Sequence, residues 1–398
     1  MTKPKPLILA TRGSPLALWQ AQYVQRQLAI LGYSSRLKII KAASDLHPDM
    51  QLADLARLSS ASKHVQANSG VHFGASFGAS FGASFGAKGA FVAAISQAVE
   101  NGEADIGIHS LKDLPLQSSG LHLDIMAVLG RNMAADVLLI KKSQVAKNTP
   151  LLARNLPHHL LYARDLCSLA NTTIATSSLR RQGLLKEASQ AVECVAIRGN
   201  VDTRLQKVMD HTHRDGLILS AASLVRLGFC SSSLRHQLRN FYMFALDKNW
   251  FVPSPGQAVM ALEAKKDFSH FFTLRSQLTC QNTWLCVFLE RMIVKALGGH
   301  CMLPFGCYAS MGKKDQLKVQ AVICNLQGQT LRYQSVENAN CLQVWNQIQS
   351  QPRIWPSLFF SSPPQYNPFE ELQKKVLREL QKKDSQNIYN TLSLPSPW

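Results

Sequence analysis

A cysteine in the C-terminal third of the chain stands in a glycine-rich turn that would display its thiol for chemistry. Gly298 and Gly299 permit backbone angles that are closed to other residues, and Pro304 ends any helix continuing from Glu290. A lone cysteine is more often a small buried hydrophobe than a nucleophile. Cys301 is therefore a candidate whose role depends on the rest of the chain.

An aspartate and a lysine follow a predicted strand in the N-terminal third. Ile106 and Ile108 alternate with small or polar neighbours as in a strand, and Pro115 closes the turn that follows. Asp113 at the strand end could move protons or stabilise a developing cation, while Lys112 could bind an anionic substituent. Turn aspartates with a lysine neighbour are also common where no chemistry takes place.

Arginines recur beside hydroxyl side chains where predicted strands end. Strand, turn and helix follow one another from 7, 173, 195 and 216, with Ser14 as a natural N-cap and Pro15 in the first helical turn. Such repeats predict an α/β fold, in which helix N-termini gather at the carboxyl ends of the strands and favour anions. The arginines expected to line this anion-binding cleft are Arg12, Arg180, Arg181, Arg198 and Arg204. Guanidinium groups bind carboxylates bidentately, so a ligand with several carboxylates would use them all.

Composition indicates an ordinary globular protein of two or three domains. The chain has 398 residues, 46% of them apolar. Its nine cysteines form no CxxC pair, which argues against a disulfide framework or a structural zinc site and favours a reducing cytoplasm. The apolar start is short and broken by Arg12, so neither secretion nor membrane insertion is expected. The net charge of +18 predicts an anionic partner, but scattered basic pairs do not favour nucleic acid.

Several sequence segments follow one another in a distinctive order. They are LATRGSPLALWQA from Leu9, GAKGAF from Gly86, ADIGIHSLKDLP from Ala104, TSSLRRQ from Thr176, IRGNVDTRL from Ile197, PGQA from Pro255 and ERMIVKALGGHCMLPFG from Glu290. In this order they resemble the porphobilinogen deaminase, or hydroxymethylbilane synthase, family over most of residues 5–310.

The resemblance implies an α/β protein with two periplasmic-binding-protein-like domains flanking a cleft, plus a smaller C-terminal α+β domain. The first domain would comprise 1–134 with a returning segment 243–264, the second 135–242, and the third 265–398 with the cysteine loop. The last domain is expected to end in a helix that begins near Asn367 and Pro368 and carries Val376 and Leu380 on one face. Segments near 141–172 and 231–245 are interpreted as surface additions.

The resemblance also implies an enzyme of the transferase class in tetrapyrrole and haem biosynthesis. It would condense four porphobilinogen molecules head to tail to hydroxymethylbilane with release of ammonia. Its cofactor would be a dipyrromethane, bound by a thioether to Cys301 and built from substrate, with no metal. The resemblance favours a monomer, and we expect it to act in the cytoplasm with no nucleic-acid or membrane partner.

Carried over residue by residue, the resemblance implies that Asp113 is catalytic. It also implies that the basic residues bind carboxylates, because every pyrrole carries an acetate and a propionate. The residues expected to bind cofactor and substrate are Arg12, Ser14, Lys88, Lys112, Arg131, Ser177, Ser178, Arg180, Arg181, Arg198 and Arg204.

The chain departs from the family pattern at several positions. Ala93 and Ala135 stand where charged residues are usual, Ala258 replaces a glycine, and His300 either is a tolerated neighbour of the cysteine or acts as a local base. Residues 73–88 contain a repeat of the four-residue unit Phe-Gly-Ala-Ser. This phenylalanine repeat lengthens the segment before Lys88 and is expected to form a loop.

Three classes of function compete on this sequence. An active deaminase is favoured because Asp113, Lys112, Cys301 and the main arginines are all present. A degenerate relative would bind pyrroles or other polyanions without turnover, as the losses at Ala93 and Ala135 suggest. A nucleic-acid-binding protein would show steep salt dependence of binding.

Overall fold

The computed structural model describes residues 5–41, 91–116, 122–144, 160–161, 163–166, 169, 171–228, 232–297, 304–312, 316–338 and 369–380. The chain forms two units, which are described one at a time. The first comprises Met1–Leu129, Met260–Thr279 and Pro356–Gln365, and the second Gly130–Val259, Cys280–Trp355 and Tyr366–Trp398. The predictions for Lys88, Cys301, His300 and the phenylalanine repeat lie outside the described residues.

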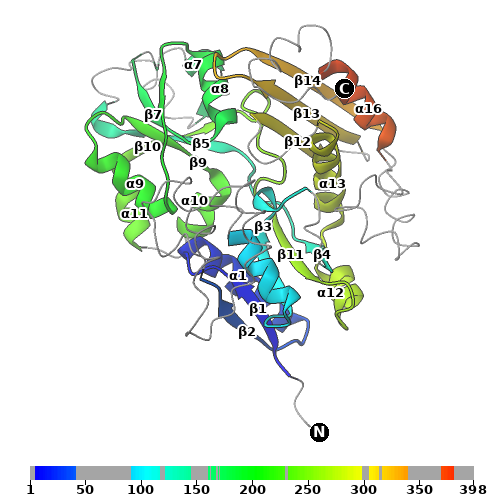
Figure 1. Cartoon of the computed structure of the whole chain (residues 1–398). Coiled ribbons are helices and arrows are strands. Elements are labelled where there is room, and N and C mark those ends of the chain that lie inside the picture. Colours follow the sequence, from blue (N-terminus) through cyan, green and yellow to red (C-terminus); the bar gives the residue numbers. More distant parts are fainter. Residues whose placement is uncertain are drawn as a thin grey trace, which may run out of the picture. The chain divides into compact units, whose positions relative to one another are not determined.

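The first unit is built on one mixed sheet (Figure 1). Strands β1 (Leu7–Thr11), β2 (Ser35–Ile39) and β3 (Ile106–Ser110) run parallel in the order β2-β1-β3. Next to β3 lies β11 (Met260–Lys265), which is antiparallel both to β3 and to β4 (Leu123–Val128). Helix α1 (Pro15–Ile30) joins β1 to β2, a helix at 91–100 precedes β3, and α12 (Phe271–Leu278) contacts β4.

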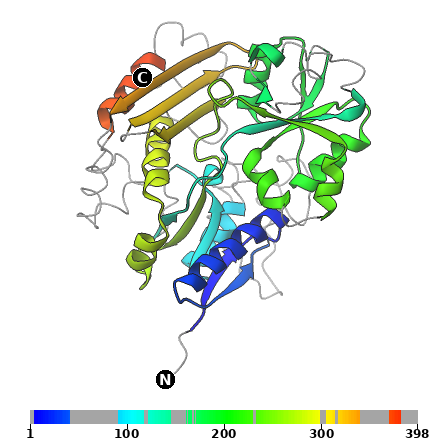
Figure 2. The same ribbon diagram turned by 180° about the vertical axis from the view of Figure 1, so that it is seen from behind.

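The first strand-turn-helix unit follows directly from its local sequence. The Ser14 hydroxyl accepts a hydrogen bond from the backbone N of Ala17 at 3.4 Å, and a proline occupies the first turn of α1. Val24 and Leu28 of the helix pack with Leu9 of β1 in the core. Figure 2 shows α1 in dark blue beside these strands. The predicted strand, cap and helix are confirmed.

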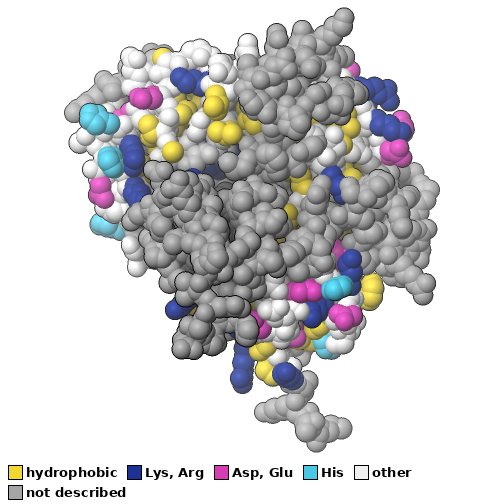
Figure 3. Space-filling view, in the orientation of Figure 1, with side chains coloured by type: hydrophobic (Ala, Val, Ile, Leu, Met, Phe, Trp, Pro, Cys, Tyr) yellow, Lys and Arg dark blue, Asp and Glu magenta, His cyan; other side chains and the backbone are white. Residues whose placement is uncertain are grey.

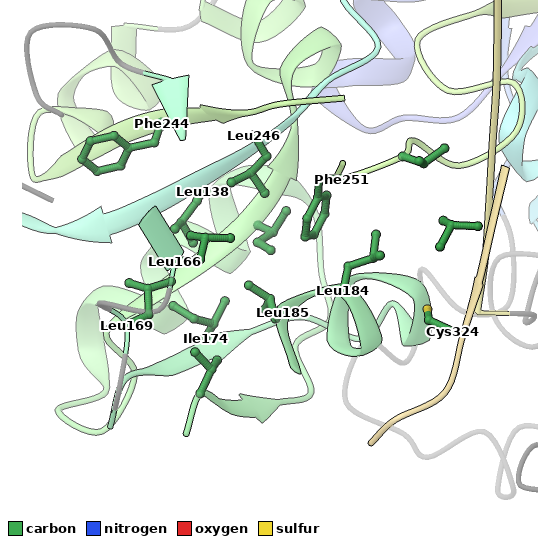
Figure 4. Close-up of a cluster of buried hydrophobic side chains, with 14 of the residues drawn as sticks. Leu138, Leu166, Leu169, Ile174, Leu184, Leu185, Phe244, Leu246, Phe251 and Cys324 are labelled. Atoms are coloured by element: carbon green, nitrogen blue, oxygen red, sulfur yellow. The ribbon is translucent and has the colours of Figure 1, made fainter. Parts of the chain in front are cut away.

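The second unit contains a larger mixed sheet with the strand order β6-β10-β5-β9-β7-β8. Its elements are β5 (Asp136–Lys141), β6 (Leu160–Leu161), α7 (Ala163–Leu166), β7 (Thr173–Ala175), α8 (Leu179–Ala188), β8 (Glu193–Val195), α9 (Val201–Asp210), β9 (Gly216–Ser220), α10 (Ala221–Gly228), α11 (Ser232–Leu238) and β10 (Phe241–Leu246). Leu138 of β5, Leu184 and Leu185 of α8 and Phe244 of β10 are fully buried in one hydrophobic cluster (Figure 4). The predicted strands near 173, 195 and 216 are confirmed.

The two sheets share one plan. Each begins with three parallel strands whose spatial order is second, first, third, namely β2-β1-β3 and β8-β7-β9. In each, an antiparallel strand follows: β11, which comes late in the chain, and β5, which precedes its neighbours in sequence. Strands β4 and β10 complete the correspondence. The expected pair of like α/β domains is confirmed.

A smaller sheet lies in the part of the second unit that follows α13 (Gln281–Ala296). Strands β12 (Phe305–Met311), β13 (Gln316–Cys324) and β14 (Thr330–Asn338) are antiparallel in chain order, and α13 packs against β12. Helix α16 (Glu370–Leu380) buries Val376 and Leu380 as expected. The C-terminal α+β part is therefore confirmed.

The predicted domain limits stay a prediction, although strand pairing bears on the segments within them. Of the segment 243–264, β10 pairs with β5 in the second sheet, and β11 pairs in the first sheet. The interpretation of 231–245 as a surface addition is wrong, because Phe241 and Phe244 are buried strand residues. Met243, which lies between them, is exposed although it is apolar.

Candidate active site

In the first unit, the candidate residues gather at the carboxyl ends of two neighbouring parallel strands. Asp113 and Lys112 lie on a 3₁₀ turn, η2 (Leu111–Asp113), directly after β3, and Arg12 follows β1. The Arg12 guanidinium carbon lies 3.4 Å from the centroid of the Phe91 ring. These side chains were expected at strand ends, and the structure places them there.

Ser14 and Gln20 stabilise the same edge of the first sheet. Ser14 caps α1, so its hydroxyl is engaged with the helix backbone. Gln20 Nε2 donates a hydrogen bond to Ser110 Oγ at 3.1 Å, which links α1 to the end of β3. The turn that bears Asp113 thus begins at a residue tied to the neighbouring helix.

In the second unit, a comparable set lies after β7 and β8. Ser177 Oγ donates to Ile197 O at 2.7 Å and accepts from Ile197 N at 2.9 Å, so the two strand ends are joined by one hydroxyl. Arg198 is exposed beside this junction. Ser178 is the N-cap residue of α8, and Arg204 Nε donates to Gly199 O at 2.7 Å.

Arg180 and Arg181 do not present their guanidinium groups as expected. Arg180 Nη2 and Arg181 Nη2 each donate to a carboxylate oxygen of Asp136 at 2.7 Å. Their Nη1 atoms donate to the carbonyls of Val252 at 2.7 Å and Ile218 at 2.9 Å. Both side chains are buried and hold an internal carboxylate, which is the reason for this correction.

The protein environment decides the charge of Asp136. Burial by itself raises the pKa of this carboxyl, but the guanidinium groups of Arg181 and Arg180 outweigh it and hold the pKa far below its ordinary value. Gln257 Nε2 donates to the same carboxylate at 3.0 Å. Asp136 is therefore an anion that is satisfied within the protein.

Arg131 is also engaged internally rather than presented to a ligand. Its two terminal nitrogens donate to the two carboxylate oxygens of Glu290 at 2.8 Å, and one of them also donates to Ala309 O at 2.9 Å. Glu290 is fully buried on α13 and accepts further bonds from the backbone N of Gly256 and of Ala309. The expectation that Arg131 binds cofactor or substrate is corrected accordingly.

Sequence reasoning missed Asp136 and Glu290 as organising residues. Each is a single acid within an apolar stretch, Asp136 ahead of Val137 and Glu290 after Leu289. A buried charge is costly unless it is paired, so an acid at such a position signals an internal partner.

The cysteine loop is bounded by described residues on both sides. Helix α13 ends at Ala296 with Leu297 as its C-cap, and β12 begins at Phe305 after Pro304. Pro304 O accepts a hydrogen bond from Cys324 N at 3.1 Å. Among the described residues, no group of three or more His, Cys, Asp or Glu side chains could hold a metal ion, and no helix is both long and apolar enough to cross a membrane.

A family model described as porphobilinogen deaminase, dipyromethane cofactor binding domain, matches residues 7–68 and 79–272. The chain belongs to the porphobilinogen deaminase family. A second model of that family, described as its C-terminal domain, matches residues 284–344. Both of the chain's units therefore contain family sequence.

Members of the family from several bacteria align with most of the chain. A porphobilinogen deaminase from Coxiella burnetii (strain RSA 493 / Nine Mile phase I) is 30% identical over 331 residues, covering 83% of this chain and 88% of that protein. Another from a Nitratiruptor species is 30% identical over 318 residues, covering 80% and 83%. One from Lawsonia intracellularis (strain PHE/MN1-00) is 28% identical over 330 residues, covering 82% and 87%.

Among solved structures, the GluR0 ligand binding core in complex with L-glutamate matches with a TM-score of 0.31 at 10% identity, covering 70% of this chain and 92% of that one. A putative periplasmic sulfonate-binding protein SsuA from Methylobacillus flagellatus KT matches with a TM-score of 0.33 at 12% identity, covering 73% and 68%. Scores of this size do not bear on the fold, which rests on the strand order given above.

The donor groups present fit the dipyrromethane cofactor that the matched domain is described as binding. In the first unit, Arg12 and Lys112 are cations at strand ends. In the second unit, taken by itself, Arg198 is an exposed cation after β8, and cations of this kind bind carboxylates. A group bearing acetates and propionates suits this chemistry.

Proposed function

We propose that this chain is a hydroxymethylbilane synthase, a transferase that condenses four porphobilinogen molecules head to tail with release of ammonia. The family match over both units supports the proposal. The observation that carries it further is the turn η2, where an aspartate and a lysine stand together at the end of β3. We expect the enzyme to act as a monomer in the cytoplasm.

A dipyrromethane attached to Cys301 would supply the terminal pyrrole carbon to which each substrate is joined. Residues of this chain would hold its carboxylates and those of the substrates: Arg12, Ser14, Lys88, Lys112, Ser177, Ser178, Arg198 and Arg204. These side chains bind and orient, because charge-assisted hydrogen bonds to carboxylates are both strong and directional. We leave Arg131, Arg180 and Arg181 out of the set, since internal carboxylates occupy them.

Asp113 would perform the proton chemistry at the substrate amine. A protonated carboxyl can donate its proton to the amine, which then leaves as ammonia, and the carboxylate that remains stabilises the cation that develops on the pyrrole. Lys112 would orient the substrate by binding one of its carboxylates. Neighbouring positions on one short turn allow both contacts to be made to the same molecule.

Neither alternative class gains support from the described residues. Figure 3 shows the Lys and Arg side chains of the visible face in separate small groups with Asp and Glu among them, which does not favour a nucleic-acid surface. Binding without turnover was suggested by the losses at Ala93 and Ala135, and the contacts of the described residues add nothing to that suggestion.

Intact-protein mass spectrometry tests the proposal. We expect a covalent dipyrrole on the wild-type chain that is absent from Cys301→Ser and present in Cys194→Ser. Cys194 is the matched control because it is partly accessible, and burial raises the pKa of its thiol and so lowers its reactivity. A bare wild-type mass that persists after incubation with porphobilinogen would reject the proposal.

Asp113→Asn separates attachment from turnover. The variant should lower the rate of porphobilinogen consumption by about 10²–10⁴-fold, the usual contribution of a general acid or base, while the dipyrrole adduct is affected less. Unchanged turnover in this variant would remove Asp113 from the catalytic role.

A further inference from the structure

A buried polar network lies inside the first unit, beside the end of β3. Glu263 on β11 accepts a hydrogen bond from Ser96 Oγ at 2.6 Å, and the same carboxylate oxygen lies 3.0 Å from His109 Nε2. All three side chains are buried. Neither the proposed chemistry nor the carboxylate-binding set uses any of them.

The sheet is shaped to admit this network. β11 and β3 pair so that Ala261 faces His109 and Glu263 faces Gly107, which puts Glu263 diagonally across from His109. A Cβ atom at Gly107 would lie 3.0 Å from His109 Nε2 and 2.9 Å from a methyl carbon of Ile95. The absence of a side chain at Gly107 therefore makes room for the imidazole to reach Glu263.

The network joins elements that carry the candidate site residues. His109 is followed by Ser110 and then directly by the turn η2 with Asp113. Ser96 lies on the helix at 91–100, whose first residue, Phe91, packs against the Arg12 guanidinium. One carboxylate on β11 thus contacts both the strand before Asp113 and the helix that supports Arg12.

We propose that Glu263 is a positioning residue for Asp113, acting through His109 and β3. Two buried donors on one carboxylate oxygen allow a single arrangement of β11, β3 and the helix at 91–100, because any shift leaves a buried polar group unsatisfied. The end of β3 is then held in one place, and with it the turn that bears Asp113. The catalytic part of this inference rests on the proposed function.

Hydrogen exchange tests the structural part without reference to activity. In Glu263→Gln, amide exchange in a peptide covering 106–116 should become at least several-fold faster than in wild type, while peptides of the second unit are unchanged. Glu103→Gln is the matched control, since it makes the same change in the same unit at an exposed pair with Lys38. Ser96→Ala removes only one of the two donors and should raise the amide exchange rate of the same peptide by a smaller factor. If Glu263→Gln does not fold, Ser96→Ala is the variant that carries the test.

Turnover tests the catalytic part. Glu263→Gln should lower kcat by about 10–100-fold with KM little changed, because displacing a catalytic group by an ångström or less costs rates of this order. In an Asp113→Asn background the same change should have almost no further effect on the residual rate, since the group that Glu263 positions is already lost.

The outcomes separate the two ideas. Unchanged exchange in 106–116, or a full additional loss of kcat in the Asp113→Asn background, would overturn the positioning role of Glu263. If wild-type protein turns over no porphobilinogen, the proposed function fails, and the exchange result alone then decides whether Glu263 holds the turn.

Discussion

Ala258 occupies a backbone conformation that favours glycine. Its φ is 70°, in the left-handed region, where a Cβ crowds the following carbonyl. Two hydrogen bonds to the carbonyl oxygen of Ala258 hold this conformation. Their donors are Arg226 Nη2 at 2.8 Å and Asn132 N at 3.2 Å. The departure from the family's glycine noted in the sequence is therefore a site of backbone strain.

Replacing Ala258 with glycine should raise the free energy of unfolding by about 0.5–1 kcal/mol. The strain relieved is about 1–2 kcal/mol, less the greater freedom of glycine in the unfolded chain. Urea denaturation measures the change. The control is Ala29→Gly on the exposed face of α1, which should lower stability by about 1 kcal/mol. If Ala258→Gly lowered the free energy of unfolding as Ala29→Gly does, the backbone at Ala258 would not be strained.

For single residues, the sequence predicted the place of a side chain in the fold better than the groups that it contacts. Ser14, Asp113 and Arg198 lie at strand ends as expected, because capping and turn signals are local. Arg180 and Arg181 carry the same local signals, yet they turn inward to Asp136, which lies more than forty residues earlier. No local pattern shows which guanidinium has a buried partner.

Among the elements, α13 connects the parts of the second unit through Glu290. The carboxylate binds Arg131, the loop before β11 through Gly256 N, and β12 through Ala309 N. It thereby links the helix that precedes the cysteine loop to the strand that follows it. The sequence indicated a helix continuing from Glu290 toward the cysteine loop, but the contacts of this buried acid could be known only from the fold.

Glu290→Gln should destabilise the protein by about 3–5 kcal/mol, because it leaves the buried Arg131 without its counterion. Thermal unfolding at neutral pH measures the effect. Glu371→Gln on α16 removes an exposed partner of Lys374 and should change stability by less than about 0.5 kcal/mol. Equal small effects at the two positions would show that Glu290 contributes no buried ion pair.

At the scale of the whole molecule, the lowered pKa of Asp136 makes the free energy of unfolding depend on pH in the acid range. Burial opposes ionisation, but Arg181 and Arg180 hold the folded-state pKa well below the ordinary 3.8. A carboxyl with a lowered folded pKa binds fewer protons when folded than when unfolded. The ionised Asp136 therefore makes its full contribution to the free energy of unfolding at pH values above the pKa of the unfolded chain. That contribution declines as the pH falls below this pKa.

Asp136→Asn should lower stability at pH 7, and its difference from wild type should shrink as pH falls from about 5 to 2. Unfolding midpoints measured across that range give the test. Asp202→Asn on the exposed face of α9 serves as the control and should leave the profile unchanged. A constant difference at all pH values would show that the ionisation of Asp136 is not linked to folding.

The strand order also bears on how the protein is made. Ribosomes release the N-terminus first, and the place between β3 and β4 is filled only by β11, which ends at Lys265. Until then those two strands lack the neighbour between them, and open strand edges invite wrong pairing. The second sheet needs nothing beyond β10, which ends at Leu246. Of the two larger sheets, the one whose synthesis starts first is thus completed last.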